Sequence, residues 1–272
     1  MIAIRSEREI GLLREANAIV AEVHDLLSEM VVPGVTTGEL DRAAEALILA
    51  RGAKPAFKGY RGYPATLCVS VESEVVHGIP GRRALRAGEI VSIDVGTLFR
   101  GYYGDAAVTH ACGRVDGQRL RLMEATDLSL ARAVAAARAG NNLREIGRAV
   151  QRTCKAAGFG VVRDFVGHGI GTALHEEPQV LNFDSGEPGP VLRPGMVLAI
   201  EPMVNMGTHR VRVLKDGWTA VTADGKPSAH FEHSVVVREH GGEILSQGTR
   251  IRWGCPDGNV LRAGSPAVET ER

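Results

Sequence analysis

The sequence predicts an α/β protein of the α+β class, made of two related halves that each contain two helices and a sheet. Two observations lead to this prediction. A helical segment at 33–53 is repeated at 139–159, and a short apolar run that ends in an acid at 86–95 is repeated at 193–202. The chain has 272 residues, 44% of them hydrophobic, which is enough for a sizeable core. Two such halves would pack around a pseudo-twofold axis.

The helices are predicted from capping and periodicity. The segments "PGVTTGELDRAAEALILARGA" and "AGNNLREIGRAVQRTCKAAGF" align without a gap, and both have the pattern of a capped amphipathic helix. Thr36 and Glu39 have capping-box spacing, and Gly52 and Gly158 follow the last turns, where glycine commonly ends a helix. A further helix is expected before each segment, at about 7–30 and 117–138.

Each repeated strand leads into an acid. Where "RAGEIVSIDV" aligns with "RPGMVLAIEP", Asp94 falls on Glu201, and each follows a run of Val, Ile and Leu that is typical of a buried strand. A third match, "GDAAVTH" with "FEHSVVV", sets Asp105 beside Glu232, and a histidine falls on a histidine where "VVHGIP" resembles "VGHGIG". Helical likeness alone could arise by chance, but acids that fall on acids twice favour a duplication.

A cluster of carboxylates from both halves predicts a metal centre. Its expected members are Asp94, Asp105, His168, Glu201 and Glu232. Four carboxylates crowded together cannot all stay ionised without cations, and two divalent ions would balance their charge. One imidazole among oxygen ligands favours Mn, Fe, Co or a catalytic Zn. Taken singly, each acid is also compatible with an edge strand, His168 with a hydrogen-bonded core histidine, and Asp105 with a turn.

Composition excludes several other classes of protein. Lys+Arg and Asp+Glu both number 32, so the net charge is zero and no nucleic-acid or membrane partner is expected. The N-terminal segment lacks the apolar core of a signal peptide, and a cytoplasmic protein is the default expectation. The four cysteines form no C-x-x-C pair, which argues against both a disulfide framework and a thiolate metal site.

Five motifs together resemble the type I methionine aminopeptidases: "VVHGIP", "SIDVGTLFRGYYGDAAVT", "GHGIGTALHEEPQVLNF", "LAIEPMVN" and "FEHSVVV". The resemblance covers about residues 5–246. It implies a pita-bread fold, in which a curved antiparallel sheet lies inside and the helices lie outside. One catalytic domain would span 1–246, with halves at about 1–115 and 116–246, and residues 247–272 are expected to form a C-terminal tail.

The resemblance also implies a reaction. A monomeric enzyme would remove the initiator methionine from nascent polypeptides in the cytoplasm, near the ribosome, and would prefer small second residues. Its cofactors would be two divalent ions, of Co, Mn, Fe or Zn. By resemblance, Asp94 would bind one ion with both oxygens, His168 and Glu201 would bind the other, and Asp105 and Glu232 would bridge them.

Catalytic and substrate-binding roles follow from the same resemblance. His77 would hydrogen-bond the scissile amide, His175 would donate to its carbonyl oxygen, and Glu201 would also shuttle a proton. The methionine side chain would lie in an apolar pocket bordered by both histidines and by Phe57, Tyr60, Tyr63, Cys68, Leu174 and Trp218. The family often has Cys at the position of Phe57 and Phe at that of Leu174. For Phe57, packing of a loop on the core explains the residue equally well.

Two alternative functions remain at this stage. A peptidase of the Xaa-Pro type shares the ligand order but usually carries a large extra N-terminal domain, whereas here the first repeat begins almost at residue 1. A metal-free peptide-binding module of the same fold would be expected to lack at least one ligand, and all five are present.

Overall fold

Helices α1 (Glu7–Met30) and α2 (Thr37–Ala50) come before most of the first-half strands, and α3 (Gly117–Ala136) and α4 (Arg144–Ala157) come before the second-half strands. They belong to a computed structural model that describes residues 2–248. All four helices were expected from the sequence. The tail predicted at 247–272 lies almost wholly outside the described residues.

Capping explains where most of these helices begin and end. Thr36 and Glu39 form the predicted capping box of α2, and Ser6 and Glu9 form a second one at α1. The expectation of an equivalent cap on α4 is wrong, because its N-cap residue is Leu143. The first amides of α4 donate instead to carbonyls of a neighbouring loop, such as that of Pro190, 2.9 Å from the Leu143 nitrogen.

The strands form four small sheets, and every pairing between named strands is antiparallel. In the first half, β4 (Ile90–Phe99) pairs with β1 (Lys54–Pro55), β2 (Leu67–Val71) and β5 (Tyr102–Ala111). In the second half, the order is β15 (Gly242–Ile244), β14 (His233–Val237), β9 (Val197–Ile200), β7 (Gly167–Gly169), β8 (Glu176–Val180). The other two sheets contain β13 (Ser228–His230), β10 (Met203–Asn205) and β6 (Gly160–Val161), and β11 (Val211–Val213), β12 (Ala220–Thr222) and β3 (Glu74–Val76).

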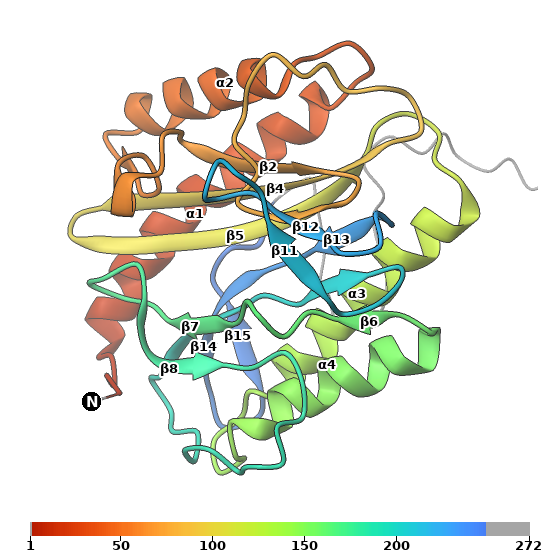
Figure 1. The fold of residues 1–272 in the computed structure, drawn as a ribbon. Coiled ribbons are helices and arrows are strands. Elements are labelled where there is room, and N and C mark those ends of the chain that lie inside the picture. The colour runs from red at the N-terminus through yellow and green to blue at the C-terminus, as the bar shows by residue number, and fades with distance from the viewer. Residues whose placement is uncertain (1, 249–272) are drawn as a thin grey trace, which may run out of the picture.

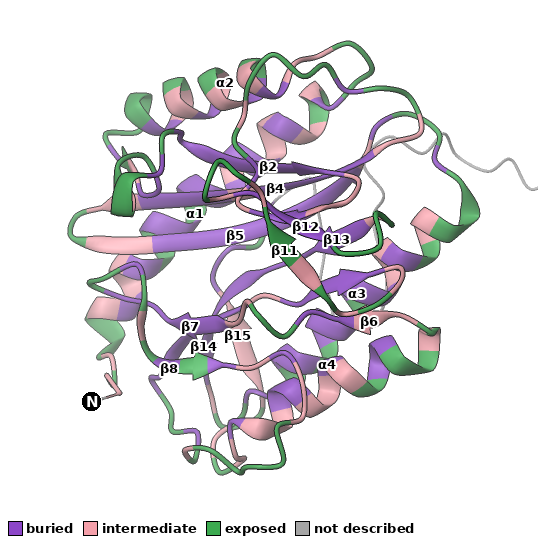
Figure 2. Ribbon diagram, viewed as in Figure 1, coloured by how far each residue is buried: buried purple, intermediate pink, exposed green. Residues whose placement is uncertain are grey.

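The sheets lie at the centre and the helices outside them (Figure 1). Helices α1 and α2 pack on the first-half sheet, and α3 and α4 pack together over the second-half strands. Figure 2 shows that the strands are largely buried, whereas the helices alternate buried and exposed residues. One apolar cluster lies within the first half, and a second joins the second half to Ile90 and Val108 of the first-half sheet. Two further clusters combine residues of both halves. None of the described helices combines the length and apolar character needed to cross a bilayer.

Strands β4 and β5 bring two of the predicted ligands together. Asp94 pairs with Ala107, and Asp105 pairs with Gly96, two residues further along β4. Since side chains alternate between faces along a strand, the two aspartates lie diagonally on the same face of the hairpin. The alternative that Asp105 is a turn residue is therefore wrong, because it lies within β5 and is only 4% exposed.

The two halves are joined at β5 and β14. The Glu232 amide donates to the Ala107 carbonyl at 2.9 Å, and the Ser234 hydroxyl donates to the Asp105 carbonyl at 2.8 Å. This junction sets Glu232 beside Asp105, the pairing that the sequence repeat predicted. The ligands of both halves are thus brought to a single seam.

Candidate active site

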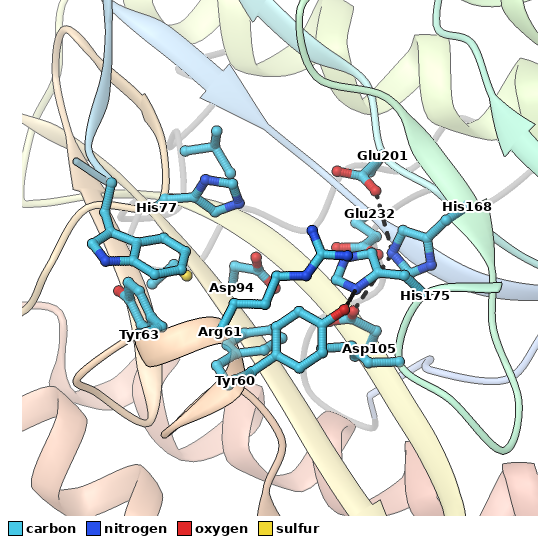
Figure 3. A pocket seen from close by; sticks show the side chains of 15 residues that line it. Tyr60, Arg61, Tyr63, His77, Asp94, Asp105, His168, His175, Glu201 and Glu232 are labelled. Carbon is cyan, nitrogen blue, oxygen red and sulfur yellow. Dashed lines mark hydrogen bonds and ion pairs between the residues drawn. The ribbon is translucent and has the colours of Figure 1, made fainter. Parts of the chain in front are cut away.

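One cavity, of about 150 Å³, lies at the seam between the halves. Every site residue predicted from the sequence lines it: Phe57, Tyr60, Tyr63, Cys68, His77, Asp94, Asp105, His168, Leu174, His175, Glu201, Trp218 and Glu232. Two further lining residues, Arg61 and Val76, were not predicted. Figure 3 shows Asp105, His168, Glu201 and Glu232 on one side, Tyr63 and His77 on the other, and Asp94 between them.

The carboxylates and His168 form a compact group. Three possible ligand atoms lie within 4.8 Å of one another, one from each of Asp105, His168 and Glu232. The His168 Nε2 is 3.9 Å from an Asp105 oxygen and 3.6 Å from a Glu201 oxygen. These separations are too long for direct hydrogen bonds and leave space for an ion between the atoms. The group therefore has the form of a cation site.

Burial raises the pKa of all four carboxyl groups, and neighbouring carboxylates raise three of them further. Burial raises the pKa of Asp94 to about 7. For Asp105, burial and then the charges of Glu232 and Asp94 raise the pKa well above its usual range. The pKa values of Glu201 and Glu232 are raised in the same way, first by burial and then by neighbouring carboxylates. Ionising all four groups therefore requires positive charge among them.

A hydrogen bond to the backbone fixes the orientation of the His168 ring relative to the carboxylates. Its Nδ1 lies 2.9 Å from the Gly169 carbonyl, to which it can only donate. The neutral ring then presents the lone pair of Nε2 toward Asp105 and Glu201. Burial lowers the pKa of His168 to about 3, which keeps the ring neutral at pH 7.

The residues present fit a metal. Three carboxylate oxygens in the cluster, of Asp94, Asp105 and Glu232, are buried and have no hydrogen-bond partner within the described chain. Buried acceptors left unpaired are costly, so such a set is expected to have a cation as its partner. The donors, mostly oxygen with one imidazole, also suit a divalent ion.

Backbone contacts hold the ligands in place. The Asp105 amide donates to the side chain of Asn17, a fully buried residue on α1, at 3.3 Å. The Asn182 side chain, also fully buried, donates to the Glu201 carbonyl at 3.0 Å. Both amide side chains thus fix the main chain at a ligand without occupying the site itself.

The two predicted catalytic histidines lie at different depths. His77 follows β3 with a left-handed backbone (φ 60°) and packs edge-on against Phe165, with ring centroids 5.4 Å apart. Burial lowers the pKa of His77 to about 4. His175 reaches the surface, and its Nδ1 lies 2.9 Å from the Tyr60 hydroxyl. Partial burial of the His175 ring, and then the charge of Arg61, lower its pKa.

The apolar wall of the cavity is firmly packed. The Tyr63 hydroxyl lies 2.9 Å from both the Leu67 and the Gly78 carbonyls, and its ring meets Trp218 edge-on at 5.1 Å. Phe57 is both a core residue and a lining residue, since it is 8% exposed and packs on Gly96. A Cβ at Gly96 would lie 2.4 Å from the Phe57 ring, so glycine there makes room for this side chain.

Two residues near the ligands were not found from the sequence. The buried His230 has its Nε2 3.9 Å from a Glu201 oxygen and 4.0 Å from a Glu232 oxygen. Its position two residues before the predicted ligand Glu232, at the end of β13, was the available signal. Arg61 offered no such signal, since an exposed arginine in a loop resembles any other surface cation.

Comparisons with known proteins agree with this geometry. A model of metallopeptidase family M24 matches residues 11–239. The methionine aminopeptidase of Clostridium perfringens is 50% identical over 246 residues, which cover 90% of this chain and 99% of that protein. Methionine aminopeptidase 1 of Bacillus subtilis is 47% identical over 247 residues, which cover 91% of this chain and 100% of that protein.

Solved structures give the same result. The crystal structure of methionine aminopeptidase from Thermotoga maritima is similar with a TM-score of 0.89 and 44% identity, covering 91% of this chain and 100% of that one. That from Rickettsia prowazekii has a TM-score of 0.89 and 36% identity, covering 90% and 100%. The predicted pita-bread fold is confirmed.

Proposed function

The chain belongs to metallopeptidase family M24, and on that premise we propose that it removes the N-terminal methionine from polypeptides by metal-dependent hydrolysis. The observation that carries this proposal is the convergence of four carboxylates and His168, from both halves of the chain, beside an apolar pocket. The similarity to methionine aminopeptidases over nine-tenths of the chain supports the same reaction.

The metal ligands are proposed to be Asp94, Asp105, His168, Glu201 and Glu232, which would hold two divalent ions of Co, Mn, Fe or Zn. The unpaired oxygens of the carboxylates and the inward Nε2 of His168 support this assignment. When bound, the ions would supply a counter-charge for the carboxylates, a Lewis acid and a water of lowered pKa.

The surrounding side chains would hold the substrate and move its protons. Glu201 would take a proton from the attacking water and pass it to the departing amine. His175 would donate from Nε2 to the carbonyl oxygen as negative charge builds there. This role requires the Tyr60 hydroxyl, 2.9 Å from Nδ1, to be the donor to that nitrogen, so that the ring proton lies on Nε2. His77, neutral at pH 7, would hydrogen-bond the scissile amide.

The pocket is proposed to select methionine. Its wall of Phe57, Tyr63, Cys68, Leu174 and Trp218 is apolar, and aromatic rings pack well against a thioether. The cavity, at about 150 Å³, is smaller than the roughly 300–1,000 Å³ of drug-sized ligand sites. It therefore suits one side chain rather than a longer stretch of peptide.

The natural substrates are proposed to be nascent polypeptides, met in the cytoplasm near the ribosome by a monomeric enzyme. A small second residue, such as Gly, Ala or Ser, is expected because three rings line the same small cavity as the proposed metal ligands. They belong to Tyr60, His77 and His175, and the Tyr60 and His175 centroids are 5.2 Å apart.

Methionine release from Met-Ala-Ser, compared with cleavage of an Xaa-Pro peptide, tests this function. We expect the first peptide to be cleaved, chelation to abolish cleavage and divalent metal to restore it. Asp105→Asn should lower metal content and methionine release, whereas Asp164→Asn, a change at an exposed aspartate, should alter neither. Preference for the Xaa-Pro peptide, or full activity of Asp105→Asn after chelation and repletion, would contradict the proposal.

A further inference from the structure

Arg61 is a cation placed at the mouth of the candidate active site. It is exposed, and of the described residues that line the cavity it is the only lysine or arginine. No hydrogen bond or ion pair joins its guanidinium to another residue in the described part of the chain. Figure 3 shows it reaching across the opening beside His175. Its charge is thus free to meet whatever leaves the cavity.

The position of Arg61 is set by the fold. It lies in a 3₁₀ turn, Tyr60–Gly62, with φ 49° and ψ 23°, a left-handed conformation that a side chain rarely adopts. Its guanidinium carbon lies 5.4 Å from the centroid of the Tyr60 ring, within reach of a cation–π interaction. The Tyr60 hydroxyl is hydrogen-bonded to His175, so the guanidinium lies next to His175, the residue proposed to bind the substrate carbonyl.

Arg61 is also electrostatically distinct from the rest of the cavity. The other charged lining residues are the four carboxylates of the metal centre, whose charge two divalent ions would balance. The lowered pKa of His175, due first to burial and then to Arg61, agrees with a positive charge close to that ring. With the carboxylates neutralised by ions, Arg61 would be the one uncompensated charge among the described side chains that line the cavity.

We propose that Arg61 is a specificity-determining residue that binds the peptide beyond the scissile bond and favours an acidic side chain at the third position. This inference rests on the proposed function, because that function directs the methionine inward and the rest of the peptide outward. The second residue lies at the scissile bond among the rings, so the third is the first to leave the cavity and meet the guanidinium.

Three peptides that differ only in charge test this role: Met-Ala-Glu-Ser, Met-Ala-Gln-Ser and Met-Ala-Lys-Ser. For the unmodified enzyme, kcat/KM should fall in that order, by about two- to five-fold per step, as expected for an exposed charge pair. The difference should lie mainly in KM, because the contact precedes the chemistry, and should shrink in 1 M salt. Arg61→Gln should remove the order, and Arg61→Glu should reverse it.

Arg100→Gln is a matched control. Arg100 also has a left-handed backbone (φ 50°) and lies 5.1 Å over the ring of the preceding residue, Phe99. It is located at the β4–β5 turn, however, and is paired with Glu15 at 2.8 Å. This variant should keep the unmodified order.

The outcomes separate the two proposals. If none of the three peptides is cleaved, both the proposed function and the role of Arg61 are overturned. If all are cleaved with no charge order, or with an order that Arg61→Gln and Arg61→Glu leave unchanged, only the role of Arg61 is overturned. A reversal with Arg61→Glu also supports the role if Arg61→Gln folds poorly.

Discussion

The floor and the rim of the cavity are built in different ways. The floor consists of Asp94, Asp105, His168, Glu201 and Glu232, and the rim consists of residues 57–63 and 171–176. On the floor, Asp94 and Asp105 lie in a ten-residue hairpin ladder, and buried side chains fix the main chain nearby. Each of these predicted metal ligands is therefore held by many contacts.

The part of the rim at residues 171–176 is held largely by one side chain. The Glu176 carboxylate accepts hydrogen bonds from the Thr172 amide at 2.8 Å, the Ala173 amide at 3.0 Å and the Arg5 guanidinium at 2.6 Å. The loop that carries Leu174 and His175 is thus tied to the N-terminal segment through one side chain. Comparison of the two regions indicates that long-range strand pairing fixes the predicted metal ligands of the floor, whereas a few side chains set the shape of the opening at the rim.

Replacing a glutamate on the floor and one on the rim should give the largest contrast. Glu201→Gln should lower kcat/KM by about 10³-fold, because it removes the proposed proton carrier and a metal ligand. Glu176→Gln should keep full metal content and lose far less activity. Peptide kinetics with metal analysis measures both. Equal metal loss in the two variants would break the distinction between floor and rim.

The Arg5–Glu176 pair should contribute more to stability than a surface pair does. Its side chains are 10% and 16% exposed, and Arg5→Ala should cost about 2 kcal/mol, between the values for exposed and buried pairs. Arg14→Ala, which breaks the more exposed pair with Glu243, should cost about 0.5 kcal/mol or less.

Denaturant unfolding measures these changes, and limited proteolysis locates them. Cleavage within 171–176 should become faster only in Arg5→Ala. If Arg5→Ala and Arg14→Ala are equally stable, the rim is held by something other than this pair.

A smaller effect than those of Glu201→Gln and Arg5→Ala is expected from Tyr60→Phe, which keeps the ring but removes the hydroxyl next to His175. Without a donor at Nδ1, the proton of the His175 ring is no longer restricted to Nε2, so carbonyl activation should weaken. We expect kcat to fall by about tenfold, close to the net value of one hydrogen bond. Unchanged kcat would mean that the tautomer is set elsewhere; a change in KM alone would assign Tyr60 to substrate binding.

The sequence predicts that the floor residues lie together because its signals are long-range and paired. Asp94 and Glu201 follow matching apolar strands, and Asp105 and Glu232 match in the same repeat, so each supports the others. The motif resemblance then added the pocket residues. Capping failed at Leu143 because a distant loop supplies the missing acceptors, and that loop cannot be located from local sequence.

Rim features were harder to predict. The partners Arg5 and Glu176 are 171 positions apart, and neither belongs to a repeated motif. The role of Arg61 depends on its left-handed backbone and its place at an opening, which exist only once the turn Tyr60–Gly62 has formed. Such contacts arise from the packed arrangement rather than from any periodic pattern.

The junction between β5 and β14 has a consequence for biosynthesis. The first half alone supplies Asp94 and Asp105, and Glu232 is added only when all but the last strands have been made. A ribosome-bound fragment that ends before Glu232 would therefore lack peptidase activity toward nearby polypeptides, even with the first-half sheet already formed. We therefore expect peptidase activity to appear only late in synthesis, after Glu232 has been made.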